Sequence, residues 1–69
     1  MKAVAEARNQ LESTHGLGKY YRLEKPDNKY AAFHYMNGSQ IVVEGNKLGT
    51  RAVSLFDSEG KLIGSIDGV

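Results

Sequence analysis

The amino-acid sequence predicts an α+β fold in which one N-terminal helix is followed by a five-stranded antiparallel sheet. Turn signals near residues 26, 37 and 57 carry this prediction, because they divide the chain after residue 18 into short strand-like runs. We expect a meander packed on the helix, with curling towards a small barrel as the alternative. At 69 residues the chain is expected to form a single domain over 1–69. The turn signals are Pro26-Asp27-Asn28, Asn37-Gly38 and Asp57-Ser58-Glu59-Gly60.

The helix is expected over residues 2–15, which contain several good helix formers and neither proline nor glycine. Val4, Ala7 and Leu11 have the spacing of a narrow apolar stripe that can lie against a sheet. Gly16 supplies the left-handed residue that ends many helices. Leu17 is then placed to fold back onto the last turns of this helix.

The first three strands are expected at about 19–25, 30–36 and 39–44. In the first hairpin, a three-residue loop with a left-handed Asn28 would set Tyr21 opposite Phe33 and Leu23 opposite Ala31. In the second hairpin, a two-residue loop at Asn37-Gly38 would set Phe33 opposite Val42 and His34 opposite Ile41. These registers divide the side chains between two faces. The first face, expected to form the core, gathers Tyr21, Leu23, Phe33, Tyr35 and Val42; the second gathers Tyr20, Arg22, Tyr30, His34, Met36, Ile41 and Val43.

The last two strands are expected at about 50–57 and 61–67, after a glycine-containing loop over residues 45–49. A type I turn closed by a left-handed Gly60 would place Asp57 opposite Lys61. The same register would pair Phe56 with Leu62 and Leu55 with Ile63. The two hairpins would complete the meander.

Composition narrows the class of protein. The chain has no cysteine, so it has neither disulfides nor thiolate metal ligands, and no apolar run approaches the roughly 20 residues of a membrane span. We therefore expect a cytoplasmic protein without a membrane partner. The net charge is +1, but residues 15–51 carry six basic against three acidic residues (net +3), while residues 52–69 carry one against three (net −2). The simplest interpretation of this asymmetry is an ordinary solvated surface.

Catalysis has little support in the sequence. The histidines are His15, near the predicted helix end, and His34, within a strand, and no cluster of carboxylates accompanies either. Gly16-Leu17-Gly18-Lys19 superficially matches a phosphate-binding loop, but its glycines follow a helix instead of preceding one. We expect a non-enzymatic protein with no cofactor and no metal site.

Nucleic-acid binding is the alternative function that the sequence suggests. The segment Lys29-Tyr30-Ala31-Ala32-Phe33-His34-Tyr35 is similar to a basic, aromatic strand that stacks on the bases of single-stranded RNA. A platform of this kind would comprise Tyr20, Arg22, Lys25, Lys29, Tyr30 and His34.

Protein binding explains the same residues with fewer demands. One short helix cannot cover both faces of the sheet, so a barrel closure, a second copy of the chain or another protein should cover the second face. Tyrosine, arginine and methionine are enriched in interfaces. We expect a domain that inhibits, adapts or regulates a larger partner, as small accessory and inhibitor proteins of phages and mobile elements do. The expected partner-binding residues are Tyr20, Arg22, Tyr30, His34 and Met36, with Lys47 and Arg51 at the rim.

Overall fold

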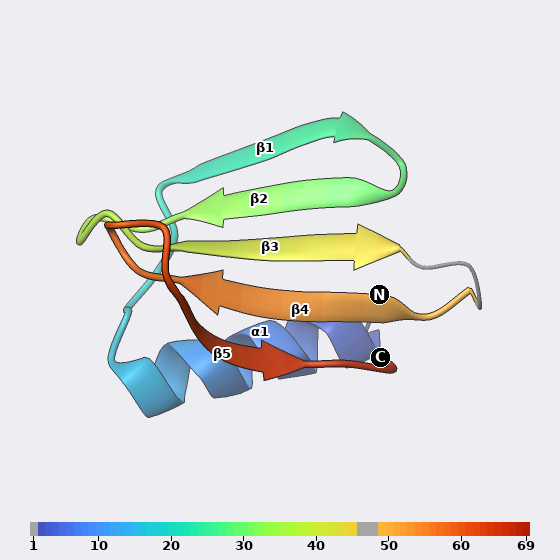
Figure 1. The fold of residues 1–69 in the computed structure, drawn as a ribbon, viewed down its shortest axis with the longest axis horizontal. Coiled ribbons are helices and arrows are strands. Elements are labelled where there is room, and N and C mark those ends of the chain that lie inside the picture. The colour runs from blue at the N-terminus through green and yellow to red at the C-terminus, as the bar shows by residue number, and fades with distance from the viewer. Residues whose placement is uncertain (1, 46–48) are drawn as a thin grey trace.

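The computed structural model describes residues 2–45 and 49–69, and it contains one helix packed on an open sheet (Figure 1). The elements are α1 (Lys2–His15), β1 (Arg22–Asp27), β2 (Tyr30–His34), β3 (Gln40–Gly45), β4 (Arg51–Phe56) and β5 (Leu62–Ile66). The strands lie in chain order, and each pairs antiparallel with the next. The predicted α+β meander is confirmed. The sheet does not close into a barrel, because β1 and β5 form its two edges.

The helix begins and ends as predicted, and the chain reverses direction directly after it. Gly16 has a φ of 64°, and the N–H of Leu17 donates to the carbonyl of Glu12 at 2.9 Å. This bond is typical of the glycine-ended helix, in which the residue after the glycine returns to the last turn. The side chain of Leu17 packs against the core, so the end of the helix is also fixed by apolar contact.

The core lies between α1 and the half of the sheet that contains β3, β4 and β5. The helix contacts β4 and β5, and its Ala7 and Leu11 are buried there. Ile41, Val53 and Leu55 face them and have 0% exposed surface. Since a helix of this length is marginal in isolation, this contact supplies most of its stability.

The β2–β3 loop is one residue longer than the sequence predicts. Gly38 has a φ of 89°, its N–H donates to the Tyr35 carbonyl, and the N–H of Tyr35 donates to the carbonyl of Ser39. Asn37 does not adopt a positive φ, which a two-residue Asn-Gly turn would require. The predicted register is therefore wrong by one residue, and Phe33 pairs with Ile41.

This shift exchanges the two faces of β3. Ile41 and Val43, predicted on the second face, lie in the core, whereas Val42, predicted in the core, lies on the opposite face. Such an exchange is the general result of a one-residue slip, because successive side chains of a strand point to opposite sides.

The β1–β2 hairpin also departs from its predicted register. Leu23 pairs with Phe33, and the register shifts between Glu24 and Asp27, a stretch that includes Pro26. Asn28 has no positive φ, so the left-handed loop predicted there does not form. Tyr21, predicted in the core opposite Phe33, is 61% exposed.

The alternation of side chains between the two faces of the sheet is also interrupted just before β1. The N–H of Tyr21 donates to the carbonyl of His34, although His34 is already paired with Arg22. Two residues therefore lie opposite one, as in a β-bulge. As a result Tyr20 lies on the helix side, where its ring meets that of Phe33 edge to face at a centroid distance of 4.9 Å.

The β4–β5 loop forms as predicted. Gly60 has a φ of 83°, and the N–H of Asp57 donates to the carbonyl of Lys61 at 2.9 Å. The predicted pairing of Phe56 with Leu62 is confirmed.

Beyond that pair the register slips, and Leu55 faces Gly64 instead of the predicted Ile63. The reason lies in the helix above, because a Cβ on Gly64 would approach Leu11 Cδ2 to 3.1 Å. The slip thus places the residue without a side chain beneath α1.

Candidate functional site

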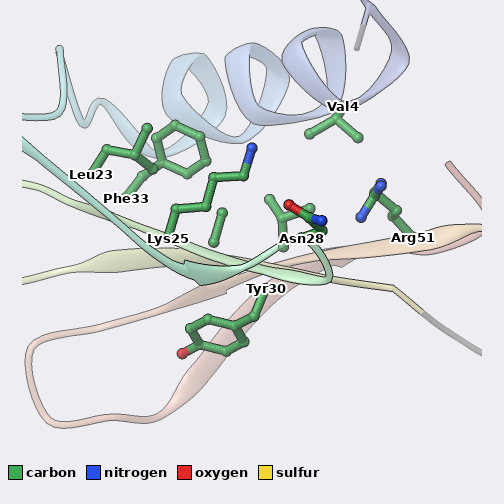
Figure 2. Close-up of a pocket in the computed structure, with 9 residues that line it drawn as sticks. Val4, Leu23, Lys25, Asn28, Tyr30, Phe33 and Arg51 are labelled. Atoms are coloured by element: carbon green, nitrogen blue, oxygen red, sulfur yellow. The ribbon is translucent and has the colours of Figure 1, made fainter.

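The sheet face turned away from α1, called the far face from here on, has no covering layer within residues 2–45 and 49–69. Cross-strand pairing arranges its side chains in three rows. Figure 2 shows the ring of Tyr30 on this side of the sheet, opposite α1. The rows are Arg22, His34, Gln40, Phe56 and Leu62; then Glu24, Ala32, Val42, Ser54 and Ser65; then Tyr30, Glu44 and Ala52.

The middle of the far face is apolar. Ala32 lies on β2 between Tyr30 and His34, and both Ala32 and its partner Val42 are buried without any second layer. Larger side chains remain accessible around this small-residue floor, and Leu62 is 54% exposed. The surface therefore combines a shallow apolar centre with aromatic and aliphatic side chains on its margins.

An ion-pair cluster occupies the β1 side of the far face. Glu24 Oε1 lies 2.9 Å from Nε2 of His34, and Glu24 Oε2 lies 3.5 Å from Nη2 of Arg22. The hydrogen bond from His34, followed by the charge of Arg22, lowers the pKa of the Glu24 carboxyl below its usual value. Glu24 thus offsets the positive charge at this corner of the face, and Glu44 adds a further carboxylate on the third row.

A groove opens on the other side of the sheet, between the first turn of α1 and the strands β1 and β2 (Figure 2). It is called the helix-side groove below, and its volume is about 210 Å³. It forms because α1 lies mainly over β4 and β5 and leaves Leu23 and Lys25 of β1 exposed on the helix side. Its lining residues are Val4, Leu23, Lys25, Asn28, Tyr30, Ala31, Phe33, Val43 and Arg51.

A polar and aromatic cluster ties α1 to the strand ends beside this groove. Nη1 of Arg8 lies 2.8 Å from Oε2 of Glu12, which also accepts a hydrogen bond from the hydroxyl of Tyr35. The guanidinium carbon of Arg8 lies 4.9 Å from the ring centroid of Phe33 and 5.2 Å from that of Tyr20. Burial, and then the Glu12 carboxylate, raise the pKa of Tyr35.

Sequence reasoning missed this cluster. The spacing of Arg8 and Glu12, four residues apart on a helix, was the available signal. Their third partner, Tyr35, is distant in sequence, and only the packing of the helix on the sheet brings it into contact.

The residues predicted to bind a partner do not all share one surface. Arg22, Tyr30 and His34 lie together on the far face, as the sequence indicates. Tyr20 lies on the helix side, and Arg51 borders the helix-side groove. The remaining two are Met36, which is 82% exposed in the β2–β3 loop, and Lys47, which falls outside the described residues.

The basic aromatic platform predicted for nucleic acid is divided in the same way. Tyr20 and Lys25 lie on the helix side, whereas Arg22, Tyr30 and His34 belong to the far face. Bases stacked on one side of the sheet would therefore meet only part of the predicted set.

Within the described ranges, no group of three or more His, Cys, Asp or Glu side chains is arranged to hold a metal ion. The same ranges contain no helix with the length and apolar character needed to cross a bilayer. Comparisons of the chain with protein-family models, with curated proteins and with solved structures gave no match. The contacts of this chain itself are therefore the guide to its function.

Proposed function

We propose that this chain is a small non-enzymatic protein-binding domain that inhibits, adapts or regulates a larger partner through its far face. One observation carries the proposal: α1 covers one side of the sheet, and the other side keeps apolar and aromatic residues accessible. Leu62 is more than half exposed there, and Tyr30 and Phe56 are half-buried. Accessible apolar patches of this kind are typical of binding surfaces.

The chemistry of the far face supports a protein partner over a nucleic acid. Its aromatic and arginine side chains, Tyr30, Phe56 and Arg22, are of the types enriched in protein interfaces. Its acidic residues, Glu24 and Glu44, would repel phosphates, and Glu24 already engages the charge of Arg22. A charged margin around an apolar centre is the usual anatomy of a protein interface.

The proposed location of the chain is the cytoplasm, since a chain without cysteine forms no disulfide of the kind that stabilises small domains in oxidising compartments. The partner is another protein or a second copy of this chain. Small accessory and inhibitor proteins of phages and mobile elements are the class that this description fits.

Two leucines with similar exposure on opposite sides of the sheet provide the test. Leu62 (54% exposed) belongs to the far face, and Leu23 (47% exposed) belongs to the helix side. Affinity capture from the native host should recover the partner of the far face with the wild-type chain and with Leu23→Ser, and should lose that partner with Leu62→Ser. Both variants should keep the wild-type circular dichroism spectrum, because neither leucine is buried.

Two results would overturn the proposal. The first is equal recovery of the partner with Leu62→Ser. The second is retention of the chain on single-stranded RNA that weakens steeply with rising salt, because counterion release marks phosphate binding. Light scattering identifies the partner as a second copy if the mass rises above 7.6 kDa with concentration and Leu62→Ser prevents the rise.

A further inference from the structure

The helix-side groove has an apolar floor that the fold itself leaves open. Leu23 from β1 and Phe33 from β2 pair with each other across the strands, and Val4 of α1 faces them from above (Figure 2). Ala31 and Val43 complete the apolar lining. Because α1 lies mainly over β4 and β5, its Val4 leaves this floor partly open, and Leu23 stays nearly half exposed.

Two cations border this floor. Lys25 extends from β1 and Arg51 from the start of β4, and Figure 2 shows both side chains reaching into the space between the sheet and α1. Across residues 2–45 and 49–69, neither side chain has an ion-pair partner. Among the described residues that line it, none is acidic, so the groove presents positive charge on an apolar surface. An occupant that matches it combines apolar area with carboxylates.

The size of the groove favours a side chain over a complete small molecule. A volume of about 210 Å³ lies below the roughly 300–1,000 Å³ that encloses a drug-sized ligand. It suits one bulky side chain that anchors a longer segment, which is how buried anchor residues act in protein interfaces. The exposure of all of β1 leaves room for the rest of such a segment.

We infer that the helix-side groove binds an acidic peptide segment of a partner protein. One bulky apolar side chain of the segment enters between Val4, Leu23 and Phe33, and carboxylates on either side of it pair with Lys25 and Arg51. The site lies on the opposite side of the sheet from the far face, and it does not depend on the function proposed for that face.

The test is a titration of the ¹⁵N-labelled chain with the acetylated, amidated peptide Glu-Glu-Leu-Phe-Glu-Glu, followed by amide chemical shifts. The amides of Leu23, Phe33 and Val43 should shift. The matched peptide Lys-Lys-Leu-Phe-Lys-Lys should produce no shifts there, since it opposes the charge of the groove. The affinity for Glu-Glu-Ala-Ala-Glu-Glu should be lower by about tenfold or more, because this peptide lacks the apolar anchor.

Variants of the chain separate the contribution of ion pairing to peptide affinity from the contribution of apolar contact. Lys25→Gln and Arg51→Gln should each weaken the acidic peptide roughly two- to fivefold, as expected for exposed ion pairs. Lys61→Gln, which removes a positive charge from the β4–β5 turn, is the matched control and should leave the affinity unchanged. Leu23→Ser should weaken binding through the apolar component, while Leu62→Ser should have no effect.

Three outcomes would overturn the inference: no amide shifts in the groove with the acidic peptide, equal binding of the basic peptide, or shifts confined to far-face residues such as His34 and Ser54. Self-association that Lys25→Gln abolishes would also overturn it, because the occupant would then be a second copy. The Leu23 and Leu62 variants distinguish failure of this site from failure of the far face, since each changes one side of the sheet.

Discussion

The two halves of the sheet share one hydrogen-bonded framework but differ in what covers them. In the half formed by β3, β4 and β5, Ile41, Val53 and Leu55 are fully buried beneath α1. In β1, every residue from Arg22 to Asp27 is exposed. Hydrogen bonding places both halves of the sheet, whereas burial concentrates the stability in one of them. The side chains of β1 are therefore free for contacts with other molecules.

The largest effect on stability should come from truncating Leu55 in the buried half. Truncation of Leu23 in the exposed half provides the comparison. Leu55→Ala should lower the free energy of unfolding by about 2–5 kcal/mol, because it leaves a cavity in a fully buried site. Leu23→Ala should lower it by less than about 1 kcal/mol, because nearly half of Leu23 is already in water. Urea unfolding of the two variants measures both values. Equal losses would contradict the division of the sheet into a stabilising and an exposed half.

The next effect concerns the loop that joins the two halves. Gly38 has a positive φ, and an added Cβ would approach the Cβ of Ser58 in the β4–β5 loop to 2.9 Å. Gly38→Ala should cost about 2–3 kcal/mol, from the strain of the left-handed backbone together with the clash.

Gly60→Ala is the matched control for the Gly38 substitution, since its φ is also positive and nothing lies within 4 Å of its added Cβ. It should cost about 1 kcal/mol from backbone strain alone. Thermal unfolding compares the two variants, and Ser58→Gly should partly rescue Gly38→Ala. A cost for Gly38→Ala no larger than that for Gly60→Ala would show that the two loops do not press together.

A smaller effect should come from the tyrosine that ties β2 to the helix. Tyr35→Phe removes the hydroxyl that donates to Glu12 and should cost about 1–2 kcal/mol. Tyr21→Phe, at an exposed position with the same chemistry, should change stability by less than about 0.5 kcal/mol.

The contribution of Tyr35 should also depend on pH. Its pKa is raised above the unfolded value of 10.0, so the contribution is complete below pH 10.0 and is lost as the pH rises above that value. The difference in unfolding free energy between the wild type and Tyr35→Phe, measured in alkaline buffers, should therefore shrink. A difference that grows with pH would contradict the assigned direction.

The smallest effect belongs to the exposed half. The pKa of Glu24 should lie below 4.5 in a carbon-detected NMR titration, and His34→Ala should raise it more than Arg22→Gln does, because the His34 hydrogen bond is the larger cause. Because folding lowers the pKa of Glu24, its ionised carboxyl stabilises the fold above pH 4.5. This stabilisation is lost as the pH falls through the pKa that Glu24 has in the folded chain. A larger rise with Arg22→Gln would reverse the assignment of causes.

The sequence predicts the elements of this fold better than their registers. Gly16 and Gly60 define their turns locally, and both act as predicted. Asn37-Gly38 fits either a two-residue or a three-residue loop, and the local sequence does not choose between them. The choice moves Ile41 and Val43 from one face to the other, so a single residue of loop length decides the composition of both faces.

The candidate surfaces were predictable only in part for the same reason. Arg22, Tyr30 and His34 share a face because simple alternation holds between them through the pairing of β1 with β2. Tyr20 lies on the other side of the sheet because of the β-bulge just before β1, which no turn residue in the sequence predicts. The helix-side groove depends on where α1 lies across the sheet, and the spacing of apolar residues on a helix does not specify that position.

Pro26 has a consequence for how this chain behaves beside other copies of itself. An exposed edge strand offers its free backbone groups to any incoming strand, which can extend a sheet from molecule to molecule without limit. In β1, Pro26 has no N–H to offer, and the irregular stretch between Glu24 and Asp27 breaks the spacing that an incoming strand would need. Only the short stretch Arg22–Glu24 keeps a regular edge, so the least covered strand of the molecule is also protected against fibre formation.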